Sequence, residues 1–353
     1  MTVPGVQARI SATILPTNKS RPRISYQELF EALQSALLKL RIEPERASLC
    51  ARLFAETTCD GIYSHGLNRF SLFVRTIRNG TVDIHARPEL VGSYGALERW
   101  DGKFGIGNLN AYQAMDRTIE LARRHGIGCV ALANTNHWMR GGTYGWQAAD
   151  AGLIGICWTN TLANLPPWGA SDPLLGNNPL VIAVPRPEGH VVLDMAMSQF
   201  SFGRLNSYQM SGQQLPVTGG YDLEGQLTRD PAAIQKSQRP LPIGYWKGSG
   251  LALLLDLMAA MLSGGQATHQ IPRDPELENG LSQNFIALNV TALDQNNSAA
   301  QIADQIIESL QASEGVRYPG ENVLKTRREN LELGIPVEQS AWDELRSLAD
   351  EAS

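Results

Sequence analysis

Two histidines in the sequence have neighbours whose side chains could take part in acid–base chemistry. His65 lies in the run Tyr63–Arg69, with Ser64 beside it and Arg69 four residues later, one helical turn away. A histidine can donate or accept a proton near neutral pH, and an arginine fork binds a carboxylate and fixes its orientation. The run therefore suits proton transfer to an acid held by its carboxylate. The alternative is a capped helix turn with a surface histidine.

His137 lies in the polar run Asn134–Gly142, directly after a predicted strand at Ile127–Leu132. Polar residues that follow a strand are typical of sites in α/β proteins. A structural histidine beside a core Trp138 is the alternative. A second predicted strand ends in the same way at Trp158-Thr159-Asn160, and the turn-prone segments 166–169 and 176–179 after it would line a cleft.

A third segment, Gly244–Gly250, leads into an apolar helix that is predicted over Leu251–Leu262. The free amides of a helix start, the Ser249 hydroxyl and the Lys247 ammonium together suit a phosphate or pyrophosphate. An ordinary Gly-Ser helix cap with an exposed lysine explains the same residues.

The sequence contains no other motif that indicates a cofactor or a metal ion. Gly126–Ala131 fits G-x-G-x-x-A by letter, but it follows a predicted helix and enters a strand. The dinucleotide-binding fingerprint needs the reverse order, so that the pyrophosphate meets a helix N-terminus. No Walker A pattern or H-E-x-x-H occurs, and no two of the six histidines have metal-ligand spacing. The sequence therefore predicts no metal site.

The elements that must position these residues are mainly helices in the N-terminal part of the chain. After them helices and strands alternate. Ser25 with Glu28 predicts a helix start, a second helix follows Pro44, and a third runs from about Asn68 to Ile77. From there on helices and strands alternate, which predicts an α/β fold with a mostly buried sheet and a helical N-terminal region. Ser201–Pro242 is long, polar and rich in Gln, Gly and Pro, and is predicted to be an extended excursion. The remaining predicted helices are 109–124, 144–150, 300–312, 322–333 and 340–349, and the remaining strands are 154–158, 180–184, 191–193 and 285–290.

The composition argues against several classes of protein. The 353 residues carry 30 Lys and Arg against 35 Asp and Glu, a net charge of -5, which argues against nucleic acid or an anionic membrane as partner. The longest apolar run contains Asp256 and is too short to cross a bilayer. The four cysteines form no C-x-x-C pair and are predicted to be reduced, which favours a cytoplasmic location. Residues 1–24 are predicted to be a flexible leader.

Several of these motifs together resemble the malate/L-lactate dehydrogenase family, whose members lack a Rossmann fold. The resemblance covers roughly residues 25–350 and rests on Tyr63–Gly66, Asn136-His137, Trp158–Asn160 and Tyr318–Glu321. It implies an α/β fold peculiar to that family, with a large mixed sheet, usually as a homodimer. It also implies a nicotinamide cofactor across a cleft and reduction of the C2 ketone of a 2,3-diketo acid by NADH.

The resemblance also implies roles for single residues. His65 matches the proton donor of the family, and His137 matches a histidine that has the acid–base role in some relatives. The residues themselves, apart from the resemblance, suggest that Arg69 holds the carboxylate of the keto-acid substrate and that Ser64 or Asn136 orients the imidazole or stabilises the oxyanion. The sequence Glu188–Val191 departs from the diketo-acid reductases, which leaves NADPH open beside NADH. The cofactor contacts carried over are His190, Val191, Val192, Leu193, Asp194, Met195, Ala196, Trp246, Lys247, Gly320, Glu321 and Asn322.

The expected organisation has three parts after the leader. Residues 25–125 form the mostly helical region, 126–315 form the region that binds cofactor and substrate, and 316–353 form a helical segment that packs back on the first. Other substrates of the same scaffold are malate, lactate, ureidoglycolate, sulfolactate and cyclic imino acids, and Ser201–Gly220 is expected to decide among them. A nicotinamide-binding regulator without activity is the alternative outside enzymes, but it would not need both His65 and Arg69.

Overall fold

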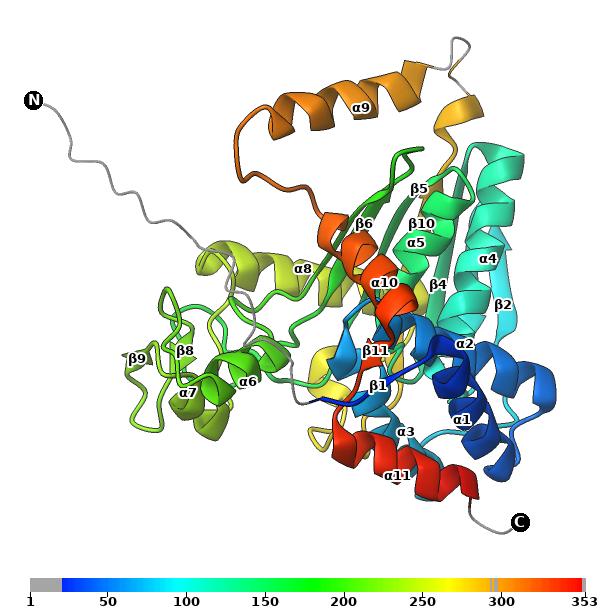
Figure 1. The fold of residues 1–353 in the computed structure, drawn as a ribbon. Coiled ribbons are helices and arrows are strands. Elements are labelled where there is room, and N and C mark those ends of the chain that lie inside the picture. Colours follow the sequence, from blue (N-terminus) through cyan, green and yellow to red (C-terminus); the bar gives the residue numbers. More distant parts are fainter. Residues whose placement is uncertain (1–20, 293, 295–297, 351–353) are drawn as a thin grey trace, which may run out of the picture.

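A seven-stranded mixed sheet forms the centre of the computed structural model, which describes residues 21–292, 294 and 298–350 (Figure 1). The strand order is β2-β3-β4-β10-β5-β6-β7; β3 and β4 run parallel, and every other neighbouring pair is antiparallel. The prediction of an α/β fold with a large mixed sheet is confirmed. The strands are β2 Glu89–Tyr94, β3 Leu97–Asp101, β4 Ile127–Thr135, β5 Ile154–Thr159, β6 Leu180–Val184, β7 Val191–Met195 and β10 Leu281–Leu288.

Helices cover both faces of this sheet. Because side chains alternate along a strand, Cys157 and Phe285 face the helices α4 (Gly107–His125) and α5 (Gly142–Asp150), and they form one core with them. Their neighbours Trp158 and Ile286 face the opposite side, where they pack against α8 (Trp246–Ser263). The central strands of the sheet are therefore buried on both faces, as their apolar residues predict, whereas the edge strand β2 is exposed.

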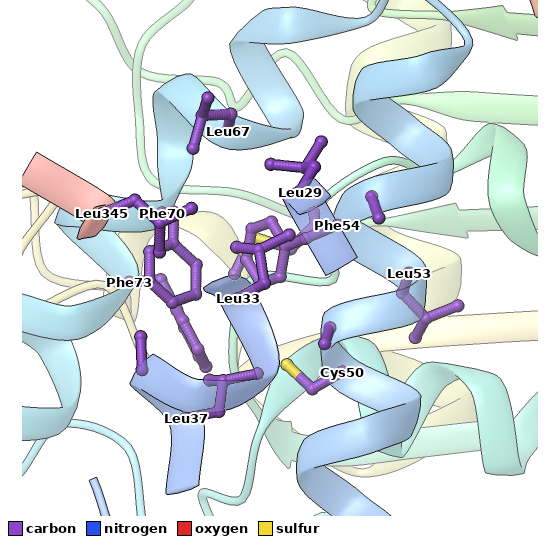
Figure 2. Close-up of a cluster of buried hydrophobic side chains, with 14 of the residues drawn as sticks. Leu29, Leu33, Leu37, Cys50, Leu53, Phe54, Leu67, Phe70, Phe73 and Leu345 are labelled. Atoms are coloured by element: carbon purple, nitrogen blue, oxygen red, sulfur yellow. The ribbon is translucent and has the colours of Figure 1, made fainter. Parts of the chain in front are cut away.

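The N-terminal helices form a second core (Figure 2). In α1 the Ser25 hydroxyl accepts the Glu28 amide, as the start signal predicts, and Leu29 and Leu33 lie on the buried side. They meet Phe54 of α2 and Phe70 of α3, whose rings pack edge to face with centroids 5.3 Å apart. The predicted helical N-terminal region is thus confirmed. Its helices are α1 Tyr26–Lys39, α2 Pro44–Cys59 and α3 Leu67–Arg78.

The C-terminal elements return to this helical region and to the edge of the sheet. Helix α11 (Gln339–Asp350) packs against α1 and α3, and β11 (Ile335–Pro336) pairs with β1 (Arg23–Ile24). Helix α10 (Glu321–Leu333) lies beside α2, whereas α9 (Ser298–Gln311) stands apart from the sheet at the top of Figure 1. The predicted leader falls mostly on residues 1–20, which lie outside the described residues; its last two residues form β1.

Four predicted features differ from the structure. The hairpin β2–β3 has no counterpart in the prediction, because its side chains are largely exposed and lack an apolar alternation. Helix α8 begins at Trp246, five residues before the predicted start. The prediction starts later because Gly248 and Gly250 are typical of a loop. The strand predicted over 285–290 is β10 at 281–288, where Ser282, Gln283 and Asn284 are polar although they are buried. The predicted excursion at Ser201–Pro242 contains regular elements: α6 Phe202–Met210, β8 Gly220–Tyr221, β9 Leu227–Thr228 and α7 Pro231–Ser237.

These four elements make a small lobe at the lower left of Figure 1, which we call the α6–α7 lobe (residues 200–241). It has a core of its own, formed by Leu205, Leu215 and Ile234. The chain leaves the body at Ser198 and returns at Pro242, and these two residues form a bridge pair. Both chain crossings between the lobe and the body therefore lie at this bridge, and Arg239 of the lobe also pairs with Asp172 of the body at 3.8 Å. Among the described residues no helix is both long and apolar enough to cross a membrane.

Candidate active site

The turn that carries His65 is fixed by the end of α2. Residues Tyr63–His65 form a single 3-10 turn, and Gly66 then separates this turn from α3. A Cβ atom at Gly66 would lie 2.3 Å from the Thr58 hydroxyl oxygen, which accepts the Leu67 amide at 3.0 Å, so the close approach requires glycine. Gly66 separates His65 from the helix that carries Arg69, so the two residues do not lie on one continuous helical turn. Arg69 lies in the first turn of α3.

His137 follows β4, which extends to Thr135, so that Asn134 and Thr135 belong to the strand. Its Nδ1 accepts the Met139 amide at 3.0 Å, so the proton of the neutral ring is on Nε2. The backbone carbonyl groups of Asn136 and His137 face the start of α4. A Cβ atom at Gly107 would lie 2.3 Å from the His137 carbonyl oxygen, so glycine is also required there.

The structure brings His65 and His137 together. Their rings stack with centroids 5.9 Å apart and an interplanar angle of 27°. The Ser64 hydroxyl lies 3.0 Å from His65 Nδ1, as the predicted orienting role of Ser64 requires. Two segments that are distant in the sequence thus form one imidazole pair.

The protein surroundings keep both imidazoles neutral. Desolvation, with the Arg69 charge next in weight, lowers the pKa of His65 to about 4, although Asp194 acts in the opposite direction. The pKa of His137 lies well below its usual range, first through desolvation and then through the charges of Arg69 and His65. Among the described residues, the guanidinium of Arg69 is the charge that lowers the pKa of both rings.

Arg69 faces a carboxylate that the sequence did not single out. Glu278 is 5% exposed, and its Oε2 lies 3.8 Å from Arg69 Nη2, which is beyond hydrogen-bond distance. Its Oε1 accepts the Leu162 amide at 3.2 Å. Both side chains line one pocket, together with Asn136 and His137. Desolvation raises the pKa of Glu278, and Arg69 lowers it in part.

A buried carboxylate joins the turn of His65 to two other segments. Asp60 ends α2, accepts the Arg140 guanidinium, and accepts Arg327 Nε and Nη2 at 2.6 and 2.8 Å. Arg140 belongs to the loop of His137, and Arg327 belongs to α10 and stacks over the Trp146 ring at 5.0 Å. Asp60 therefore joins the turn of His65, the loop of His137 and helix α10.

The predicted cofactor segments converge on β7, the edge strand of the sheet. His190 precedes it, and Val191–Met195 form it. The Val192 amide donates to the Pro319 carbonyl group at 2.9 Å, and Gly320 adopts a φ of 96° against the same strand. The predicted segments 190–196 and 320–322 thus lie side by side. The Asp194 carboxylate accepts the Gly142 amide at the start of α5 at 2.8 Å.

Trp246 and Lys247 lie just beyond the other end of this strand. The Ile243 amide donates to the Met197 carbonyl group at 2.8 Å, which places the start of α8 next to the residues after β7. Because α8 begins at Trp246, Ser249 lies within its first turn, where its hydroxyl accepts the Trp168 amide at 3.1 Å. The predicted phosphate cradle in front of Leu251 is therefore not a loop before a helix.

The α6–α7 lobe lies against the turn of His65. A Cβ atom at Gly203, in the first turn of α6, would lie 3.3 Å from both Cβ and Oγ of Ser64. The start of the segment expected to decide specificity, Ser201–Gly220, thus adjoins Ser64.

Sequence reasoning missed Glu278 and Asp60. Glu278 follows Asp274 and Glu276 in a charged run that reads as solvated surface, and only the fold places it in a pocket. In the sequence, Asp60 is predicted only to end the second helix. Within the described residues no group of His, Cys, Asp and Glu side chains could hold a metal ion, and all four cysteines are free.

Known proteins resemble this chain in sequence and in fold. A family model described as malate/L-lactate dehydrogenase matches residues 24–346. A 2,3-diketo-L-gulonate reductase of Klebsiella pneumoniae is 46% identical over 332 residues, which are 92% of this chain and 100% of the relative. Among solved structures, the sulfolactate dehydrogenase of Methanocaldococcus jannaschii has a TM-score of 0.87 at 25% identity and covers 94% of this chain and 97% of its own. A putative malate/lactate dehydrogenase of Escherichia coli has a TM-score of 0.86 at 28% identity and covers 93% of this chain and 94% of its own.

Proposed function

Because this chain belongs to the malate/L-lactate dehydrogenase family, we propose that it reduces 2,3-diketo-L-gulonate to 3-dehydro-L-gulonate with NADH. It is an oxidoreductase, and enzymes of this family use a nicotinamide cofactor. The observation that carries the proposal is a stacked pair of neutral histidines beside the guanidinium of Arg69, in a chain 45–46% identical to reductases of this diketo acid.

We assign a groove at the edge of the sheet to the dinucleotide. It has a volume of about 510 Å³ and lies beside the start of α10. Its lining includes Asn322, three cations that can bind phosphate groups, and four acids: Arg317, Lys325, Arg328, Glu188, Glu321, Glu329 and Glu332. The buried Oε2 of Glu321 has no hydrogen-bond partner among the described residues and is an acceptor for a ligand hydroxyl. We assign His190–Ala196, Trp246, Lys247 and Gly320–Asn322 to the cofactor, which supplies the hydride for C2 when it is bound.

The side chains of the site then position and protonate the substrate. The guanidinium of Arg69 makes no hydrogen bond within the described part of the chain and faces Glu278 at 3.8 Å, so its donors are available to the substrate carboxylate. A carboxylate on Arg69 offsets the charge that lowers the pKa of His65, which favours the protonated imidazole. His65 delivers its proton to the oxygen on C2 while Ser64 holds Nδ1, and the Nε2–H of His137 donates to a substrate oxygen.

The test is oxidation of NADH by the purified protein with 2,3-diketo-L-gulonate, beside oxaloacetate, pyruvate, 3-sulfopyruvate and a cyclic imine. Turnover of the diketo acid well above the others supports the proposal. The likeness to a sulfolactate dehydrogenase makes a 2-keto acid such as 3-sulfopyruvate the second candidate. Preferred turnover of such an acid would keep the roles of His65 and Arg69 and reject the named substrate.

The proposed enzyme is a homodimer through α8. Leu253, Leu254, Leu257, Met258 and Met261 form one stripe on its outer face and are between 40% and 74% exposed. Ala252, Leu255 and Ala259 form the buried stripe on the opposite side. A helix that is apolar all round is normally covered on all sides, so a second copy of this helix is the expected cover.

A further inference from the structure

The pocket beside His137 contains one cation and one anion. Arg69 and Glu278 both line it, and the charge of each offsets that of the other at 3.8 Å. Both neighbouring imidazoles are neutral, because desolvation lowers their pKa values. A single carboxylate that enters the pocket can pair with Arg69. A second carboxylate would meet Glu278 in a desolvated space, where repulsion between charges is strong.

The same wall offers acceptors without donors. Glu278 Oε1 is used by the Leu162 amide, whereas Oε2 accepts no hydrogen bond within the described residues. The Asn136 amide group donates to the carbonyl groups of Phe104 and Gly105 at 2.7 and 2.9 Å, so its Oδ1 is left buried without a partner. An unpaired buried acceptor such as Asn136 Oδ1 is costly, and a ligand hydroxyl can satisfy it. Glu278 Oε2 faces Arg69 at 3.8 Å and can accept a second hydroxyl.

We infer that Glu278 is a specificity-determining residue, which admits an acid that carries one carboxylate and several hydroxyl groups and rejects dicarboxylates. This inference rests on the proposed function in one respect, namely that the pocket of Arg69 receives the substrate. Glu278 would distinguish a sugar acid from malate. The chemistry of the histidines and of Arg69 alone suits both acids equally well.

The test uses binding, so that it does not depend on turnover. In the presence of NADH neither L-gulonate nor L-malate can be oxidised, and calorimetry gives the dissociation constant of each. We expect the wild-type protein to prefer L-gulonate. The change Glu278→Gln removes the charge, keeps the shape and still accepts the Leu162 amide. It should lower the ratio of the two dissociation constants by at least ~10-fold, equivalent to about 1.4 kcal/mol.

Two variants serve as controls. Glu278→Asp keeps the charge and should keep a preference for L-gulonate. Glu276 lies two residues earlier, is exposed and pairs with Arg75 outside the pocket, so Glu276→Gln should leave the ratio unchanged. An unchanged ratio in Glu278→Gln, an equal change in Glu276→Gln, or failure of the wild-type protein to bind either acid would overturn the inference.

A change in the ligand tests the same repulsion without any variant. The 4-amide of malate lacks the second charge, and the wild-type protein should bind it at least ~10-fold more tightly than malate. Equal affinity for the two would overturn the inference even if Glu278→Gln fails to fold. Absence of turnover with 2,3-diketo-L-gulonate, by contrast, rejects the proposed substrate and leaves both binding ratios measurable.

Discussion

His65 and His137 stack at 5.9 Å, yet only His65 can gain a proton without losing a hydrogen bond. Nδ1 of His137 accepts a backbone amide, and a proton on that nitrogen would face the N–H of Met139. Nδ1 of His65 meets the hydroxyl of Ser64, which can rotate to donate or to accept. This difference favours His65 as the proton donor and His137 as a neutral hydrogen-bond donor.

Replacing His65 by Gln should lower kcat about 10²–10⁴-fold, because the alkoxide then receives its proton from water. Binding of NADH, measured by fluorescence titration, should not change. His85→Gln is the matched control, since His85 is exposed and lies outside the site. Turnover at the wild-type rate in the His65 variant would reject its role as proton donor.

Binding of a carboxylate should draw a proton into the site. In the free protein the pKa of His65 is about 4, so the ring is neutral at about pH 6. A ligand carboxylate on Arg69 raises this pKa, and L-gulonate should therefore bind with net proton uptake. Calorimetry in buffers of different ionisation enthalpy measures the uptake. It should vanish in His65→Gln, and an equal uptake in that variant would contradict the assignment.

Asp60 should be more important for stability than other acids of this chain. Its removal as Asp60→Asn leaves the buried guanidinium of Arg140 without its counter-ion, which should cost about 3–5 kcal/mol of unfolding free energy. Urea unfolding followed by circular dichroism measures this loss. Asp343→Asn, on the exposed face of α11, should cost less than about 0.5 kcal/mol. Equal losses for the two variants would show that Asp60 does not hold the three segments together.

A charge in the exposed stripe of α8 should separate the subunits. Leu257→Glu places a carboxylate in the middle of the stripe, and light scattering after gel filtration should then give the mass of one chain. Leu331→Glu alters a comparably exposed leucine on α10 and should leave a dimer. A dimeric Leu257 variant, or a wild-type monomer, would contradict the proposed interface.

Much of the fold was predictable because its strands and helices carry strong periodic patterns. The helix start at Ser25 and the buried strand at Ile127 follow from local chemistry, and the structure has both. The hairpin β2–β3 was not predictable, since its partner β4 is contributed from elsewhere in the chain. The start of α8 was missed because glycine is a poor helix former, whereas here Gly248 lies against the backbone of Ile243.

The candidate site was predictable in its residue types and less so in its arrangement. His65, Arg69 and His137 could be found from their neighbours in the sequence. The stacking of the two histidines depends on how α2, β4 and α4 meet, which no local pattern encodes. Glu278 gave no local signal, because a charged loop residue is normally solvated.

The α6–α7 lobe adjoins the turn of His65 at Gly203 and is joined to the body at the bridge between Ser198 and Pro242. Arg239 of the lobe also pairs with Asp172 of the body at 3.8 Å. The core formed by Leu205, Leu215 and Ile234 is separate from the two large cores. A substitution in this small core is therefore expected to alter the wall beside Ser64 without loosening either large core.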